Sequence, residues 1–277
     1  MLDMALVDDI IMRALKEDMP MGDITTDSIV DPHAACTARL IAKEAGVLAG
    51  LQVFERVFRI FDPQIYIETY CSDGEKVEAG TLIMHLSGNT RAMLKAERTA
   101  LNLLQRMSGI ATETSKFVEA LRAYSTKIVD TRKTAPGIRY LDKYAVRAGG
   151  GTNHRYCLSD GILIKDNHIK AAGSIKEAVE RARAAAPHTI KIEVETETLQ
   201  QVKEAVEAGA DIIMLDNMTT DEMKKAVDYI NGRALTEASG NVTLDKAVDI
   251  AKTGVDLISS GSLTHSVKAM DISLKFE

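Results

Sequence analysis

The hydrophobic pattern divides the chain into parts with different periodicities. Near the N-terminus, apolar residues recur at helical spacing from Leu6 to Leu15, which predicts a helix over residues 3–16 that ends before Pro20. Between residues 34 and 90 the chain instead carries glycine-punctuated, strand-like runs, at 38–42, 46–49, 65–71 and 81–86, with helical spacing at 52–61. These runs predict a small antiparallel sheet with one intervening helix.

A strong helical pattern follows at residues 91–107, RAMLKAERTALNLLQRM. Leu94, Leu101 and Leu104 share an apolar side, and Arg98 lies at the margin of that side. Ser108-Gly109 is expected to end this helix. We place the domain boundary at this break, so that residues 1–108 form an N-terminal α/β sandwich domain.

From residue 109 onward, strands and helices are predicted to alternate. Apolar runs end, in turn, at Asp130, Lys165, Glu195, Asp216, Glu237 and Ser260. The last four endings are 21, 21 and 23 residues apart, enough for a strand, a turn and a helix in each unit. A full eight-stranded barrel needs about 250 residues, and only 169 follow Ser108. We therefore predict an open, incomplete parallel (β/α) barrel of about six strands over 109–264, with the tail 265–277 packed back on the N-terminal domain.

Composition narrows the class of protein. Hydrophobic residues at 45% and charged residues at 27% are ordinary for a globular protein, and the net charge of -6 disfavours a nucleic-acid partner. No apolar run is long enough to span a membrane, and acids interrupt the apolar pattern of the N-terminus, unlike a signal peptide. Cys36, Cys71 and Cys157 form no CxxC pair, and the histidines show no zinc-ligand spacing. We expect a cytoplasmic protein.

The candidate chemistry is concentrated between residues 130 and 170. Four aspartates in this stretch are outnumbered by eight basic residues: Arg132, Lys133, Arg139, Lys143, Arg147, Arg155, Lys165 and Lys170. Such a local excess of positive charge in an acidic chain indicates a pocket for a small anion. Gly149, Gly150 and Gly151 provide a backbone that can approach a ligand closely, just before His154 and Arg155.

Barrel geometry brings residues that are scattered in the sequence to one place. Active sites of barrels lie at the carboxyl ends of the strands, so we expect the charged strand ends to converge. Guanidinium forks bind carboxylates with paired hydrogen bonds, which makes a planar dicarboxylate a suitable ligand for Arg132, Lys133, His154, Arg155 and Lys165. Glu195 and Asp216 suit a hard divalent cation, because magnesium uses one or two carboxylates plus substrate phosphates.

Two small-residue loops follow the last two predicted strands. They are Ser239-Gly240-Asn241 and Ser260-Gly261-Ser262, and each leads toward a predicted helix N-terminus that can accept a phosphate. The alternative interpretation is an ordinary tight turn between strand and helix. From the pattern alone, phosphate binding is the favoured interpretation.

Several of these blocks resemble one known family. DTRKTAPG, KYAV, GGGTNHR and LIKDNH, in this order and spacing, are similar to quinolinate phosphoribosyltransferase, also called nicotinate-nucleotide pyrophosphorylase. The resemblance extends from GDITTD at 22–27 to ISSGSLTHS at 258–266. It implies an open barrel, quinolinate and phosphoribosyl pyrophosphate as substrates, a decarboxylating pentosyl transfer that forms nicotinate mononucleotide in NAD biosynthesis, and magnesium as cofactor.

The resemblance also assigns roles to residues. It implies that Lys133, Lys165, Glu195 and Asp216 are catalytic, and that Arg98 reaches the quinolinate pocket of a second subunit in a homodimer or larger even oligomer. Asn241 departs from the family pattern, which has a second glycine at this place. Asparagine tolerates positive φ better than most residues, so the loop is expected to keep its shape.

Three alternatives remain open at this point. Arg139, Lys143 and Arg147 follow one another at i+4, which favours an ordinary solvated helix face. Asp130 is open to a purely orienting role, and His168 is equally compatible with a structural and a catalytic one. The rival functions are a relative associated with molybdate transport, a phosphoribosyltransferase that uses nicotinate, and a non-catalytic ligand-binding barrel.

Overall fold

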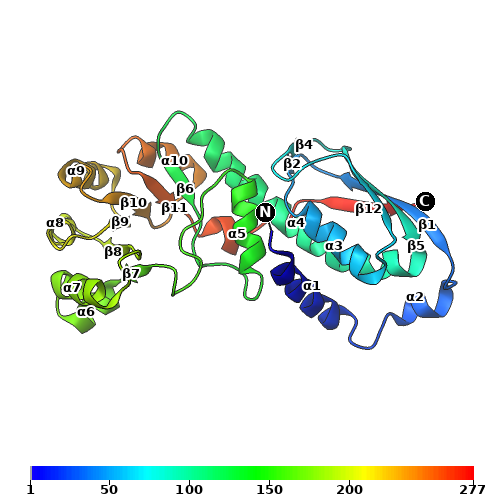
Figure 1. The fold of residues 1–277 in the computed structure, drawn as a ribbon. Helices are drawn as coiled ribbons and strands as arrows, with labels where there is room; N and C mark the ends of the chain where they lie inside the picture. Colours follow the sequence, from blue (N-terminus) through cyan, green and yellow to red (C-terminus); the bar gives the residue numbers. More distant parts are fainter. Residues whose placement is uncertain (1) are drawn as a thin grey trace. The chain divides into compact units, whose positions relative to one another are not determined.

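The computed structural model describes residues 2–277 and falls into two compact units (Figure 1). Of the described residues, unit 1 takes in 2–115, 134–150 and 264–277, and unit 2 takes in 116–133 and 151–263. Within the described residues, no helix is both long and apolar enough to cross a membrane.

Unit 1 is built on a four-stranded sheet of order β12-β1-β5-β3, with every neighbouring pair antiparallel. A separate antiparallel pair joins β2 to β4. The strands are β1 (Ala35–Ala42), β2 (Gly46–Val47), β3 (Tyr66–Thr69), β4 (Lys76–Val77), β5 (Leu82–Asn89) and β12 (Ile272–Phe276). The helices are α1 (Met4–Asp18), α2 (Ile24–Ile29), α3 (Leu51–Phe61), α4 (Thr90–Ala120) and α5 (Arg139–Ala148).

One apolar core holds unit 1 together. Phe54 and Phe58 of α3 are fully buried and pack with Leu40 and Leu86 of the sheet. The predicted small antiparallel sheet with an intervening helix is therefore present, and the burial of two aromatic side chains from one helix face contributes to its stability.

The predicted end of the long helix at Ser108-Gly109 is wrong, because α4 continues to Ala120. Glycine inside a helix costs about 1 kcal/mol relative to alanine, but here it serves a close approach: a Cβ at Gly109 would lie 2.2 Å from the carbonyl oxygen of Lys268. Ser108 also contacts a distant segment of unit 1, because its Oγ accepts the Ala49 backbone N–H at 3.1 Å. Packing overrides local propensity at this position.

Unit 2 is a six-stranded parallel sheet of order β6-β11-β10-β9-β8-β7. Its strands are β6 (Lys127–Val129), β7 (Ile162–Ile164), β8 (Ile192–Thr196), β9 (Ile212–Asp216), β10 (Leu235–Ser239) and β11 (Leu257–Ser259). Helices α6 (Asp166–Ala172), α7 (Ile175–Ala185), α8 (Leu199–Glu207) and α9 (Thr220–Ile230) lie on one side of the strands (Figure 1), followed in the chain by α10 (Leu244–Ala251) and α11 (Ser262–His265). β6 and β7 are the two sheet edges, so the barrel is open and six-stranded, as predicted.

The alternation of side chains along the strands separates core from site. In β8, Ile192 and Val194 are fully buried in the core that the helices cover, whereas Glu193 and Glu195 point to the opposite face. The face away from the helices therefore carries the charged side chains of β8.

Candidate active site

The carboxyl ends of β7, β8, β9 and β10 carry four of the predicted site residues. Lys165 follows β7, and its Nζ donates to Oε2 of Glu195 on β8 at 2.5 Å. Asp216 ends β9 beside Ser239 of β10, its partner in the strand register. The structure thus pairs one predicted lysine with one predicted metal ligand, and places the other metal ligand next to a predicted phosphate loop.

Asp130, at the end of β6, organises the glycine-rich loop. Its side chain is fully buried, with Oδ1 accepting the His154 backbone N–H at 2.8 Å and Oδ2 accepting the Asn153 side-chain N–H at 2.7 Å. The orienting role proposed for this aspartate is what these contacts support. These hydrogen bonds fix the backbone of the segment that carries His154 and Arg155.

Arg132 and Arg155 form the cationic part of the site. Burial and the neighbouring Arg132 guanidinium lower the pKa of Arg155, against the opposing charge of Glu193. Arg155 also donates from Nη1 to the Gly161 carbonyl at 2.8 Å, which holds the guanidinium in place. Two guanidinium groups close enough to affect each other favour an anionic ligand that satisfies both.

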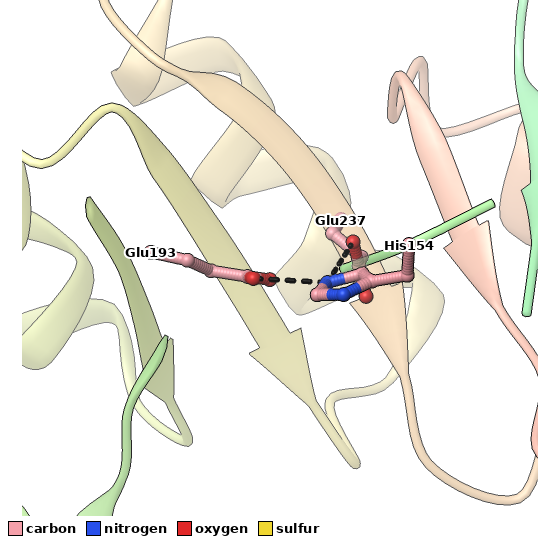
Figure 2. Close-up of side chains that lie close together, drawn as sticks. All are labelled: His154, Glu193 and Glu237. Carbon is pink, nitrogen blue, oxygen red and sulfur yellow. Dashed lines mark ion pairs between the residues drawn. The ribbon is translucent and has the colours of Figure 1, made fainter. Parts of the chain in front are cut away.

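His154 belongs to a buried cluster of one histidine and two glutamates that sequence reasoning missed (Figure 2). His154 Nε2 lies 2.9 Å from Oε2 of Glu193 on β8 and 3.5 Å from Oε2 of Glu237 on β10. Burial lowers the pKa of His154, but the hydrogen bonds and charges of the two glutamates outweigh it and raise the pKa to about 10. Burial also raises the pKa of Glu193, against the opposing hydrogen bond from His154.

A sequence signal for this cluster existed. Glu193 and Glu195 alternate in the apolar run IKIEVE, which places both on one face of a strand, and Glu237 ends the run ALTE. Acids within buried strands are rare unless they have a partner. The apolar pattern predicts that the strand ends at Glu237, whereas β10 continues to Ser239 and has Glu237 in its middle.

Lys133 and His168 lie at loop and helix positions. Lys133 is exposed on the loop after β6, where its backbone N–H donates to Thr131 Oγ1 at 3.0 Å. His168 accepts the Lys165 backbone N–H on Nδ1 at 2.9 Å, which closes the first turn of α6. This contact supports the structural interpretation of His168.

Both predicted phosphate loops adopt unusual backbone or side-chain arrangements. Gly240 and Asn241 have φ of 94° and 45°, and the Asn241 side chain donates to Oδ1 of Asn217 at 3.5 Å. Asn241 thus takes the positive φ expected of it. In the second loop, the hydroxyl oxygens of Ser260 and Ser262 are 2.7 Å apart, and Gly261 lies between them.

Two basic residues of unit 1 behave differently from each other. Arg98 is exposed on α4, and burial raises the pKa of its neighbour Glu97. Lys143 of α5 is only 4% exposed, so the prediction of a solvated face through Arg139, Lys143 and Arg147 is wrong for its central member. An i+4 spacing of basic residues does not reveal which side of a helix packs.

Comparison with known proteins covers nearly the whole chain. Residues 23–108 match the family model "Quinolinate phosphoribosyl transferase, N-terminal domain", and residues 110–275 match the corresponding C-terminal domain. A protein of Bacillus subtilis named probable nicotinate-nucleotide pyrophosphorylase [carboxylating] is 48% identical over 93% of this chain and 89% of its own length. A quinolinate phosphoribosyltransferase [decarboxylating] of Nicotiana glauca is 43% identical over 97% and 82%.

A solved structure gives the same result for the fold. The nicotinate-nucleotide pyrophosphorylase of Francisella tularensis superposes with a TM-score of 0.95 at 42% identity, covering 100% of this chain and 98% of that one. Sequence, fold and the arrangement of charged strand ends agree with one another. The chain belongs to the quinolinate phosphoribosyltransferase family.

Proposed function

We propose that this protein transfers the phosphoribosyl group of phosphoribosyl pyrophosphate to quinolinate, releasing pyrophosphate and CO2 and forming nicotinate mononucleotide, a step of NAD biosynthesis. The observation that carries the proposal is the match to both family domains in order, over a barrel edge that holds cationic and acidic groups. A dicarboxylate needs more positive charge than a monocarboxylate, and Arg132 beside Arg155 supplies it.

The chain's own residues act by binding and positioning. Arg132, His154 and Arg155 bind the two carboxylates, while Lys133 and Lys165 add positive charge where the two substrates meet. The ring nitrogen attacks the anomeric carbon as pyrophosphate departs, through a transition state with oxocarbenium character. The nitrogen thereby becomes cationic, and this positive charge stabilises the electron pair left on the ring by loss of CO2. A proton then replaces the lost carboxylate.

Magnesium is the proposed cofactor, and the acidic residues present fit it. Glu195 and Asp216 are carboxylates on the neighbouring strands β8 and β9, and oxygen ligands of this kind are what magnesium takes together with substrate phosphates. When bound, the ion neutralises charge on the departing pyrophosphate. The loops Ser239-Gly240-Asn241 and Ser260-Gly261-Ser262 are proposed to bind phosphate groups of the same substrate.

Product analysis tests the reaction directly. Purified protein is incubated with phosphoribosyl pyrophosphate and magnesium, with either quinolinate or nicotinate as acceptor, and nicotinate mononucleotide and CO2 are measured. Quinolinate should be converted with release of one CO2 per product, and turnover should disappear when magnesium is chelated. Equal or better turnover of nicotinate contradicts the assignment, and absence of turnover with both acceptors favours a non-catalytic barrel.

The oligomeric state belongs to the proposal as well. Arg98 is exposed on α4, and the block around it resembles the family segment that reaches a partner's pocket, so we propose a homodimer or larger even oligomer with shared sites. Homodimers of Arg98→Ala and of Lys133→Ala should each be nearly inactive. After random subunit exchange about half of the dimers are mixed, each with one intact site, so about a quarter of all sites regain activity. Mixed dimers that stay inactive contradict shared sites.

We also place the protein in the cytoplasm. Cys36, Cys71 and Cys157 are all free thiols, which suits a reducing compartment. Fractionation of the source cells, followed by detection with an antibody against the purified chain, tests the location.

A further inference from the structure

The cluster of His154, Glu193 and Glu237 contains more buried acceptors than the described residues can satisfy. Glu237 is fully buried and Glu193 is 3% exposed. Both oxygens of Glu237 and Oε1 of Glu193 lack a hydrogen-bond partner among the described residues, while Oε2 of Glu193 lies 2.9 Å from His154 Nε2. Figure 2 shows both carboxylates directed at the same nitrogen of one imidazole. Buried carboxylates require a nearby positive charge or a shared proton.

The direct register partners of the two glutamates on the neighbouring strands are apolar. In the strand register, Glu193 lies between Leu163 of β7 and Ile212 of β9. Glu237 lies between Met214 of β9 and Leu257 of β11. All four neighbours are apolar.

The remaining charged groups come from the loop that carries His154 and from the segment after β6. The charges of Arg155 and Glu193 act on each other, and the charge of Arg132 acts on Arg155. Asp130 accepts the backbone N–H of His154 on Oδ1. The imidazole is therefore the group that meets both carboxylates directly.

We propose that Glu237, together with Glu193, is a positioning residue that fixes the imidazole of His154 in its charged form and in one orientation at the floor of the quinolinate site. The proposal rests on the proposed function in one respect only: the ligand that the charged imidazole would help to bind is quinolinate. The state of His154 itself is a property of the ligand-free protein.

A second hydrogen bond of the His154 ring, at Nδ1, would be altered if the ring became charged. His154 Nδ1 accepts the backbone N–H of Arg155 at 2.7 Å, which requires Nδ1 to be unprotonated. The two carboxylates favour a proton on both ring nitrogens. The carboxylates dominate, because one hydrogen bond between neutral groups is weaker than the counter-charge that two buried carboxylates need. The charged ring then has an Nδ1–H beside the Arg155 N–H, and these adjacent donors suit a carboxylate.

A divalent cation is the competing occupant of the cluster. One ligand atom from each residue can be chosen so that all three lie within 4.8 Å of one another. Metal binding, however, requires a neutral histidine, and the guanidinium groups of Arg155 and Arg132 next to the cluster oppose a further cation. The geometry points to the imidazolium, and metal binding is an outcome that the test must detect.

Nitrogen-15 NMR of histidine-labelled, ligand-free protein measures the state of the ring. The His154 signals are assigned by their loss in His154→Gln, and are followed from pH 6 to pH 10. We expect both ring nitrogens to stay protonated to above pH 8 in the unmodified protein. In Glu237→Gln the midpoint should fall by about one unit or more, because removing an opposite charge within about 4 Å has this effect. Glu237→Asp should restore most of the shift.

Quinolinate binding gives the second readout, by calorimetry at pH 6 and pH 8.5. For Glu237→Gln, affinity should be near that of the unmodified protein at pH 6 and weaker at pH 8.5, by about tenfold for each unit that the NMR midpoint of the variant falls below pH 8.5. KM for quinolinate should change more than kcat. Glu207→Gln, which removes an exposed carboxylate from α8, is the matched control and should leave both readouts unchanged.

Three results overturn the proposal. One is a His154 midpoint near its ordinary value in the unmodified protein, and another is a midpoint that does not move in Glu237→Gln. The third is stoichiometric binding of Zn2+ or Mn2+ that Glu237→Gln abolishes. Because NMR needs no substrate, an enzyme that fails to turn over quinolinate refutes the proposed function while leaving the positioning role testable by itself.

Discussion

Two buried ionic clusters, one in each unit, show opposite designs. In unit 1, Asp142 is fully buried and accepts two parallel hydrogen bonds from Arg106, both at 2.9 Å. The Ala135 backbone N–H adds a third at 3.2 Å, and Arg106 also donates to the Thr264 carbonyl at 3.1 Å. In unit 2, the carboxylates of the His154 cluster leave three oxygens without hydrogen bonds.

The difference indicates what each cluster is for. A buried pair whose donors and acceptors match one another has nothing left to offer a ligand, so Arg106 and Asp142 serve the fold. A cluster with unsatisfied groups is retained at a cost in stability, which is typical of sites that bind or hold charge. Saturation of hydrogen bonds, more than burial or charge, separates the structural cluster from the functional one.

The largest expected effect is on the structural side. Arg106→Ala leaves Asp142 buried without its counter-charge, and breaking a buried pair in this way costs about 3–5 kcal/mol of unfolding free energy. Urea denaturation followed by circular dichroism measures it. Arg122→Ala is the control, because Arg122 is 80% exposed in its pair with Glu119 and such pairs contribute about 0–1 kcal/mol. Similar losses in both variants would remove the distinction between the two clusters.

Lys133→Ala should reverse this pattern, with a large loss of activity and little loss of stability. Lys133 is exposed on the loop after β6, and removal of one group that stabilises transition-state charge typically lowers kcat by about 10²–10³. Steady-state kinetics and thermal denaturation are compared in the same preparation. Lys170→Ala, on exposed α6, is the matched control. A variant that unfolds easily, or that keeps near-normal kcat, contradicts a catalytic role for Lys133.

The barrel was predictable because parallel strands are buried on both faces and therefore read as apolar runs that end in charge. The six strand positions follow from that pattern, and the barrel rule predicted that charged strand ends such as Lys165 and Glu195 converge, although not that these two side chains pair. Roles for single residues depended on family blocks such as GGGTNHR, since a strand-end acid on its own is equally suited to capping a helix.

The features that the sequence did not predict depend on contacts between distant parts of the chain. Gly109 looked like a helix breaker because the approach of Lys268, 159 residues later, is invisible in local sequence. Lys143 looked solvated because its spacing matches an exposed face, yet α5 buries it. Glu193 and Glu237 meet at His154 only once β8 and β10 are placed in one sheet. The periodicity of a helix or strand predicts which face a residue lies on. It does not predict which part of the chain packs against that face.

The pH dependence of the melting temperature gives a further test of the difference between the two clusters. The pKa of His154 is raised from an ordinary 6.5 to about 10, so its contribution to stability is complete below about pH 6.5 and is lost as pH rises through about 10. The melting temperature should therefore fall more steeply between pH 7 and pH 10 in the unmodified protein than in His154→Gln. Parallel slopes in the two proteins contradict a charged His154.

The smallest expected effect concerns the phosphate loop at Asn241. Its amide reaches Asn217 only at 3.5 Å and its φ is 45°, so the side chain contributes little that glycine would lose. Glycine adopts this backbone without strain, and Asn241→Gly should change KM for phosphoribosyl pyrophosphate less than about threefold and unfolding free energy by less than about 0.5 kcal/mol. Asn241→Ala is the informative control, because left-handed backbone costs an ordinary residue about 1–2 kcal/mol. If Asn241→Gly weakens phosphoribosyl pyrophosphate binding as much as Asn241→Ala does, the asparagine side chain itself contacts the ligand, and this loop belongs with the functional cluster rather than with the backbone that supports it.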